Sequence, residues 1–248
     1  MRRMRSSYKM IYAIAVVLIF WYILYLILNS FVIPNPGAVL IRFTEILLPV
    51  LTKHLVASSY RLFIALFFTT LVGYVIGLMI GISKRADQLI SPIIYLFFPV
   101  PRIAFLPVFM ILFGLGDVSK IVLMIAIAIF QVMISSRDGV KDIPLEVLLS
   151  AHSLKLSKWQ MICHIYIPAS LPKLFTSLRL ALGSSMAALF FAENYATKYG
   201  IGYYIMNAWV KVDYEGMYCG IIAISLLGVL FFKGVDQLQR KVCAWQLS

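Results

Sequence analysis

Six apolar runs, most of them long enough to cross a lipid bilayer, constrain the fold of this 248-residue chain. A helix needs roughly 20 apolar residues to span the hydrocarbon core of a membrane. With 62% hydrophobic residues, the chain is also far more apolar than a soluble domain. We therefore expect an all-α integral membrane protein with about six transmembrane helices. The runs lie near residues 10–32, 62–82, 90–109, 121–134, 174–191 and 217–232.

The basic residues indicate how these helices cross the membrane. A net charge of +12 could point to nucleic acid, but Lys and Arg also collect in the cytoplasmic loops of membrane proteins. With the amino terminus inside, fourteen Lys and Arg residues lie inside and six lie outside. We therefore predict a multi-pass protein of the bacterial inner or plasma membrane with both termini cytoplasmic and no nucleic-acid partner. The outer six are Arg42, Lys53, Arg61, Lys120, Lys198 and Lys211.

The third apolar run is expected to be broken. It contains Pro92, Pro99, Pro101 and Pro107, and each proline removes a backbone donor and obstructs the preceding helical turn. Broken backbone at membrane depth is tolerated mainly where it is buried in protein or lines a cavity. Arg102 lies inside this break, so it either lines a pathway or extends its charge to the outer interface.

A polar segment, residues 141–173, separates the fourth and fifth apolar runs. Apolar residues recur at helical spacing in each half, which predicts two short amphipathic helices. Pro144 would open the first helix, and Pro168 and Pro172 would close the second. Helices this short need a surface to lie on, and on the cytoplasmic side the best candidate is a soluble partner.

Several signals expected of other protein classes are missing. The sequence has no phosphate-binding loop and no credible arrangement of catalytic side chains, so we expect a non-catalytic subunit that binds no cofactor or metal. A membrane enzyme or assembly factor would need reactive groups at one membrane face. A self-sufficient carrier would show broken helices in both halves, and here only one half is broken.

Two further charged residues lie near the ends of the fifth run. Arg179 is near its cytoplasmic end and Glu193 is near its outer end. Together with Arg102, these side chains are candidates for a pathway or a gate. For Glu193 the alternatives are a surface charge at a helix end or an ion pair with a basic group such as Lys198.

Four stretches resemble the membrane subunits of binding-protein-dependent ABC importers, in particular the nitrate/sulfonate/taurine (NitT/TauT) branch. They are PVPRIAFLPVFMILFGLGDVSKI, DGVKDIPLEVLLSAHSLKLSKWQ, IYIPASLPKLFTSLRLALG and FAENYATKYGIGYYI. The resemblance covers residues 60–248 and implies a permease core of the type I importer fold. Residues 1–59 then form an added transmembrane helix with an outer amphipathic segment near 38–55.

The resemblance identifies residues 141–173 as the coupling (EAA-like) loop, which docks the ATPase in this family. Its proposed docking residues here are Pro144, Glu146, Leu149, Ser150, Ala151, Lys155, Trp159 and Pro168. The chain departs from the family at two positions. Leu149 stands where a glutamate is usual, and Lys155 stands where a glycine ends the first loop helix. A lysine there must either strain the left-handed cap or let the helix continue.

The resemblance also implies partners and a mechanism. Two permease copies, most simply a homodimer, would form the pathway, and two ABC ATPase copies using ATP and Mg²⁺ would drive alternating access. An extracytoplasmic binding protein would deliver the substrate. The substrate would be a small anion such as nitrate, taurine or an alkanesulfonate. Thiamine-precursor pyrimidines or riboflavin are the alternative cargoes, and a carrier outside the ABC class is the less favoured reading.

Overall fold

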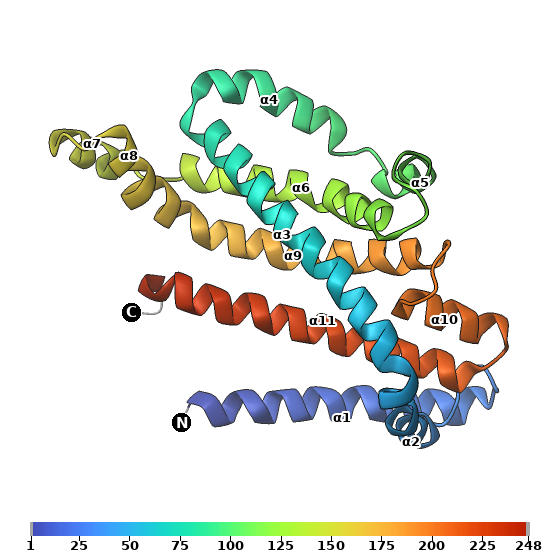
Figure 1. The fold of residues 1–248 in the computed structure, drawn as a ribbon. Helices are drawn as coiled ribbons and strands as arrows, with labels where there is room; N and C mark the ends of the chain where they lie inside the picture. Colours follow the sequence, from blue (N-terminus) through green and yellow to red (C-terminus); the bar gives the residue numbers. More distant parts are fainter. Residues whose placement is uncertain (1, 247–248) are drawn as a thin grey trace.

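The structure, a computed structural model, describes residues 2–246, including all side chains except those of residues 2–7, 9, 10 and 246. The basic residues of the amino-terminal flank therefore lie outside the described side chains. The described part is helical throughout, with no strand (Figure 1). Its longer helices are α1 (Arg2–Leu28), α2 (Pro36–Ile46), α3 (Thr52–Ile82), α4 (Lys84–Phe97), α5 (Leu106–Phe113), α6 (Asp117–Lys141), α7 (Leu145–Ser153), α9 (Ile167–Glu193), α10 (Ile201–Val210) and α11 (Tyr214–Val242).

Short segments link these helices. They are a π-helix η1 (Leu47–Leu51), a 3-10 helix η2 (Arg102–Phe105), the single turn α8 (Lys158–Met161), a second π-helix η3 (Ile162–Tyr166) and a final 3-10 turn η4 (Ala244–Gln246). The start of α1, the end of α11 and α7 lie at one end of the bundle, called here the α7 end (Figure 1). The opposite end carries α2 and α10 and is called the α10 end.

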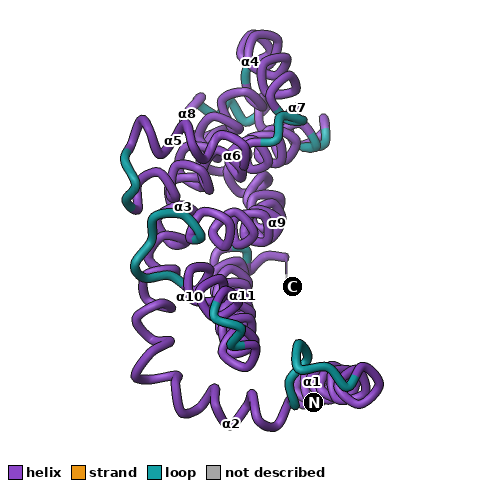
Figure 2. Tube along the Cα trace, turned by 90° about the vertical axis from the view of Figure 1, so that its right-hand side faces the viewer, coloured by secondary structure: helices purple, strands orange, loops and turns teal. Residues whose placement is uncertain are grey.

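Helices α3, α6 and α9 pack side by side and form the centre of the molecule (Figures 1 and 2). The glycines at positions 73, 77 and 81 of α3 face α6, as their four-residue spacing predicts. A Cβ atom at Gly77 would lie 2.6 Å from the carbonyl oxygen of Met133. The close backbone contact between α3 and α6 therefore requires glycine at this position. This contact holds the two helices together.

The number of spans agrees with the sequence. Five helical segments are long and apolar enough to cross a membrane, and the bent pair α4–α5 makes up to six. The bend between these two helices is 83°, and it falls at the prolines around position 100. The predicted break in the third apolar run is therefore confirmed.

The first half of the chain differs from expectation where α2 meets α3. Residues 38–55 were expected to form a separate amphipathic helix, but α2 continues through η1 into α3, which begins at Thr52. Pro49 lies inside η1, and the wider π-turn keeps the chain helical past this proline. Helix α3 alone therefore begins ten residues before the apolar run, and the continuous helical span begins at Pro36.

The second half of the polar segment is also different. The prediction that Pro168 and Pro172 close a short helix is wrong, because residues 158–193 form one continuous helical span. Pro168 directly follows the π-turn η3, which lets the helix continue past a missing N–H, and Pro172 lies inside α9. The predicted outer loop after Glu193 likewise contains an additional helix, α10.

Candidate functional site

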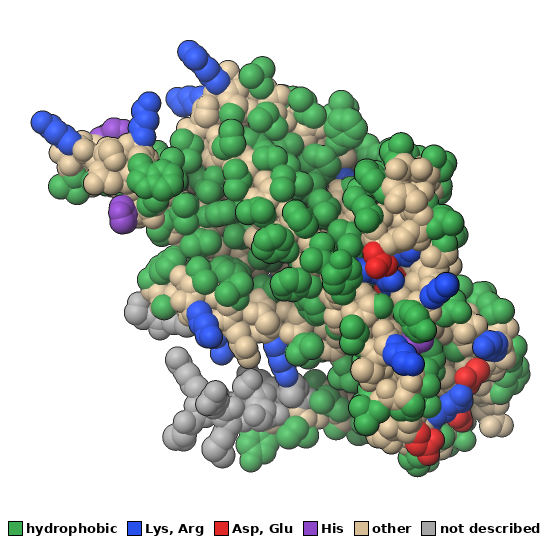
Figure 3. Space-filling view, viewed as in Figure 1, with side chains coloured by type: hydrophobic (Ala, Val, Ile, Leu, Met, Phe, Trp, Pro, Cys, Tyr) green, Lys and Arg blue, Asp and Glu red, His purple; other side chains and the backbone are tan. Residues whose placement is uncertain are grey.

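The first candidate site is the coupling loop (residues 141–173), whose projecting part is formed by α7, α8 and the turn between them. It projects from the α7 end, where basic side chains and histidines gather beyond the hydrophobic middle of the molecule (Figure 3). Several of its apolar side chains are exposed: Leu154 by 75%, Trp159 by 72% and Leu149 by 58%. Glu146 and Ser150 are exposed beside them, whereas Ala151 is buried and anchors the loop.

The turn between α7 and α8 retains the shape that glycine usually gives it. Lys155 has φ 54°, in the left-handed region, and α7 ends at Ser153. The Leu156 amide donates to Ala151 O at 3.3 Å and the Lys155 amide donates to His152 O at 2.9 Å, which is the Schellman pattern. Of the two expected consequences of losing glycine, the structure therefore shows the strained cap.

The start of α8 is fixed by a reciprocal cap. The Gln160 amide donates to the Ser157 hydroxyl at 3.3 Å, and the Ser157 amide donates to Gln160 Oε1 at 2.8 Å. This capping box satisfies two amides that a helix start would otherwise leave free. A cavity of about 400 Å³, lined partly by Pro144, Pro168 and Lys173, lies under the loop.

Arg102 joins the broken span to α6. Its guanidinium donates to Phe97 O (3.0 Å) and Phe98 O (2.6 Å) at the end of α4, and to Ile127 O (3.1 Å) in α6. It also lies over the rings of Phe98 and Phe130. Within the part of the chain that the structure describes, Arg102 has no carboxylate partner. Its bonds to Phe97 O and Phe98 O lie at the end of α4, where the break removes helical N–H donors, and its bond to Ile127 O ties this end to α6.

Arg179 lies between α9 and α11, toward the α7 end. It forms an ion pair with Asp236 at 3.0 Å and donates to Gln239 Oε1 at 2.6 Å. Its partners differ from those of Arg102 and Glu193, so the structure does not bring the three candidate pathway residues into one site.

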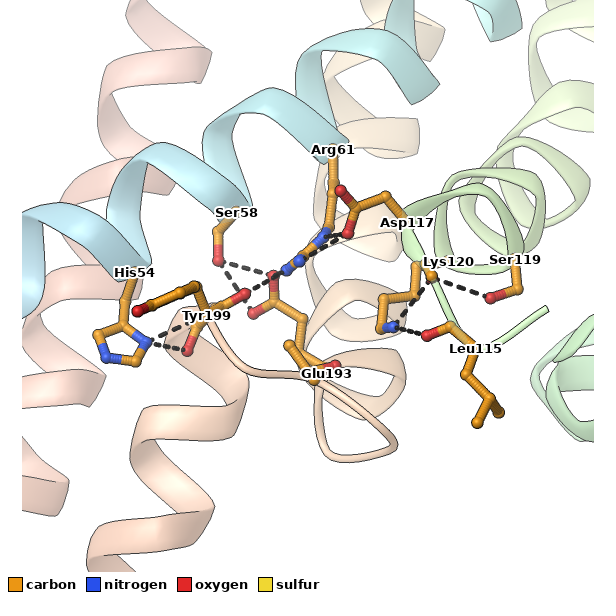
Figure 4. A network of polar contacts seen from close by, with 12 residues as sticks. His54, Ser58, Arg61, Leu115, Asp117, Ser119, Lys120, Glu193 and Tyr199 are labelled. Atoms are coloured by element: carbon orange, nitrogen blue, oxygen red, sulfur yellow. Dashed lines mark hydrogen bonds and ion pairs between the residues drawn. The ribbon is translucent and has the colours of Figure 1, made fainter. Parts of the chain in front are cut away.

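Glu193 is the centre of a buried polar network near the α10 end (Figure 4). Its side chain is fully buried and lies 2.6 Å from Arg61 NH1. The Ser58 hydroxyl contacts both carboxylate oxygens, at 2.8 and 2.9 Å, and the Gly202 amide donates at 2.8 Å. Of the two predicted alternatives for Glu193, the structure shows the ion pair, but with Arg61.

The network also fixes the turn between α9 and α10. Arg61 donates to Tyr199 O, the Ile201 amide donates to the Ser58 hydroxyl, and His54 Nδ1 lies 3.0 Å from Gly200 O. A Cβ atom at Gly200 would lie 2.4 Å from the Glu193 carboxyl carbon. Gly200 therefore gives the turn the space to lie against the carboxylate.

Two further charges complete the network. Asp117, at the start of α6, accepts from Arg61 Nε at 2.8 Å, and the buried Lys120 ammonium donates to Leu115 O and Gly116 O (Figure 4). These roles and that of Ser58 were not predicted from the sequence, where Arg61 and Lys120 were placed among the outer charges. Their apolar surroundings were the one available signal, since an ionisable residue inside a span needs a partner.

These groups are suited to holding helices together and to binding charge, rather than to metal chemistry. Among the described residues, no cluster of three or more His, Cys, Asp or Glu side chains could hold a metal ion.

Comparison with known proteins gives consistent matches. Residues 70–243 match the family described as "Binding-protein-dependent transport system inner membrane component". The chain is 34% identical to the taurine transport system permease protein TauC of Escherichia coli (strain K12), over 88% of this chain and 82% of TauC. It is 31% identical to the putative aliphatic sulfonates transport permease protein SsuC of Bacillus subtilis (strain 168), over 90% and 81%.

A solved structure shows the same fold at lower identity. The MetNI methionine ABC transporter in an inward facing conformation matches with a TM-score of 0.70 and 16% identity, over 80% of this chain and 98% of that chain. At this identity the likeness concerns the fold alone.

Proposed function

This chain belongs to the family of inner-membrane components of binding-protein-dependent transport systems, and from that premise we propose how its parts work in import. It is a multi-pass, non-catalytic permease subunit with the type I importer fold. We propose that it is the pathway-forming subunit of an ATP-driven importer, that the α7 end and both termini face the cytoplasm, and that the coupling loop docks an ABC ATPase.

The exposed apolar surface of the coupling loop is the observation that carries this proposal. Leu149, Leu154 and Trp159 are exposed on the coupling loop, whose helices α7 and α8 project at the α7 end (Figure 1). Exposed apolar groups beside charged ones are typical of a protein interface. The proposed docking residues exposed on this surface are Pro144, Glu146, Leu149, Ser150, Lys155 and Trp159, with Ala151 buried beneath them and Pro168 half-buried.

The proposed assembly contains two copies of this subunit and two ATPase copies, with an extracytoplasmic binding protein at the α10 end. ATP binding and hydrolysis in the ATPase supply the differential free energy that alternating access requires. Arg102, Arg179 and Glu193 are proposed to act along the pathway or at its gate, at three separate depths.

The proposed substrate is a small anion, with sulfonates such as taurine the first choice. Support comes from the taurine and aliphatic sulfonate permeases at 34% and 31% identity. A relative named as a formylaminopyrimidine transport permease is only 22% identical, which makes a pyrimidine the less favoured cargo.

The docking role is tested by reversing one charge in the coupling loop. Glu146→Arg should weaken co-purification with the partner ATPase while leaving membrane insertion unchanged. Glu45→Arg is the matched control, because Glu45 is also an exposed helix residue but lies at the α10 end. Equal ATPase recovery from both variants would refute the docking role. Uptake that persists after the cell's ATP is depleted would refute the importer function.

A further inference from the structure

Arg61 bridges two carboxylates of very different accessibility. The Glu193 side chain is completely buried, whereas the Asp117 side chain is 48% exposed. Arg61 itself is 5% exposed. One edge of the guanidinium is therefore locked inside the protein by Glu193, and the other edge, Nε and NH2, faces a carboxylate that solvent reaches. Asp117 Oδ1 lies 2.8 and 2.7 Å from these two nitrogens.

The segment that carries Asp117 has open space beside its glycines, while the Lys120 ammonium and the Ser119 hydroxyl hold the carbonyls of Leu115 and Gly116. It follows Gly114, Leu115 and Gly116, and Gly114 has φ 81°, a left-handed conformation that favours glycine. A Cβ atom at either glycine would meet no other atom within 4 Å. By contrast, a Cβ atom at Gly200 would collide with the Glu193 carboxylate. The exposed partner of Arg61 thus lies beside open space, and the buried partner lies beside a confined turn.

Displacement of Asp117 would change the net charge of the network around Arg61. Two cations, Arg61 and Lys120, lie with two carboxylates, Asp117 and Glu193, in one network. Without Asp117 the buried groups would be two cations and one carboxylate, an excess of one positive charge. An uncompensated buried charge is costly, so the vacated edge of Arg61 would favour another anion.

We propose that the Nε and NH2 edge of Arg61 is an anion-binding subsite, and that Asp117 occupies it in place of a small oxyanion. The inference rests on the proposed import of small anions and names a residue that contacts them. A sulfonate or nitrate presents oxygens that the guanidinium edge can bind as it binds a carboxylate. Binding exchanges one anion for another at Arg61, so the network stays neutral while the half-exposed Asp117 side chain turns toward solvent.

The test measures anion affinity directly on the full chain in lipid nanodiscs. Sodium methanesulfonate is titrated at constant ionic strength against sodium chloride, and binding is followed by calorimetry. Asp117→Asn removes the competing charge and keeps a polar side chain. It should bind methanesulfonate about five- to tenfold more tightly than the unmodified protein, because a partly exposed ion pair opposes binding only modestly.

Two further variants make the result specific. Arg61→Lys combined with Asp117→Asn keeps the positive charge but removes the planar edge, and it should lose most of that gain. Asp213→Asn is the matched control: Asp213 also pairs with an arginine, Arg42, but Arg42 retains Glu215 at 3.3 Å. Its affinity should not change.

The outcomes separate this inference from the proposed function. If Asp117→Asn binds methanesulfonate no more tightly than the unmodified protein, the subsite is refuted, even if the complex imports sulfonates. An equal gain in Asp213→Asn would also refute it, because the effect would then be general to outer carboxylates. Loss of ATPase co-purification, by contrast, would refute the importer and leave the measured anion affinity as it stands.

Discussion

Arg61 NH1 lies 2.6 Å from Glu193 Oε1, although the two residues are 132 positions apart in the chain. The pair joins the first half of α3 to the last residue of α9. It also places the carboxylate at the first turn of α10, where the Gly202 amide donates to it. A negative charge at a helix start is stabilised by the free amides there. One ion pair therefore fixes three helices at the α10 end.

Glu193→Gln should strongly destabilise the protein. The amide keeps most of the shape but removes the charge opposite Arg61, and breaking one side of a buried ion pair costs about 3–5 kcal/mol. Because Asp117 remains as a second partner, we expect the free energy of unfolding to fall by about 3 kcal/mol, measured by unfolding in mixed detergent. Glu215→Gln, at a partly exposed pair with Arg42, should cost less than about 1 kcal/mol. Equal losses would show that burial of the pair does not set its energy.

Gly200→Ala should disturb the same network through a steric clash rather than through a change of charge. The added Cβ would lie 2.4 Å from the Glu193 carboxyl carbon, so either the turn or the carboxylate must move. We expect a loss of about 2 kcal/mol, within the range for overpacked sites. Gly183→Ala in α9 is the control, because its Cβ meets nothing within 4 Å. That change should be neutral or stabilising by up to about 1 kcal/mol, since alanine favours helix.

Arg102→Lys should destabilise the bent span despite keeping the charge. A lysine cannot donate to Phe97 O, Phe98 O and Ile127 O with one planar group, and it loses the contacts with two rings. Hydrogen bonds from charged groups are each worth about 1.5–3 kcal/mol, so we expect a loss of about 2 kcal/mol. Arg179→Lys retains a carboxylate partner and should lose less. The reverse order of stability would contradict the capping role of Arg102.

The sequence predicted the features that depend on local pattern. Apolar length predicted the spans, prolines predicted the bend at Arg102, and helical spacing predicted α7. The charge network was not predictable in this way, because Arg61 meets residues 56 and 132 positions away. No periodicity encodes such a contact, and Arg61 and Lys120 read simply as outer charges. The prediction from Pro168 was wrong for a different reason: next to the π-turn η3, a proline lies inside a continuous helical span.

Lys155→Gly and Lys158→Gly, three residues apart, should have opposite effects on the coupling loop. Lys155 has φ 54°, a conformation that costs an L residue roughly 1–2 kcal/mol. Glycine removes that strain, and its greater freedom in the unfolded chain offsets about 0.4–1 kcal/mol of the gain. Lys155→Gly should therefore be neutral to stabilising. Lys158 lies in the right-handed α8, so glycine there should cost about 1 kcal/mol.

The measurement is limited proteolysis of the loop in the assembled complex, together with the amount of ATPase that co-purifies. Lys155→Gly should resist proteolysis at least as well as the unmodified chain and should co-purify with as much ATPase. Lys158→Gly should be cleaved faster and should co-purify with less ATPase. Lys155→Val adds a third point, because a β-branched side chain fits the left-handed region worst and should be the most damaging of the three. If the two glycine variants lose protection equally, Lys155 does not hold the left-handed cap, and α7 must continue past Ser153.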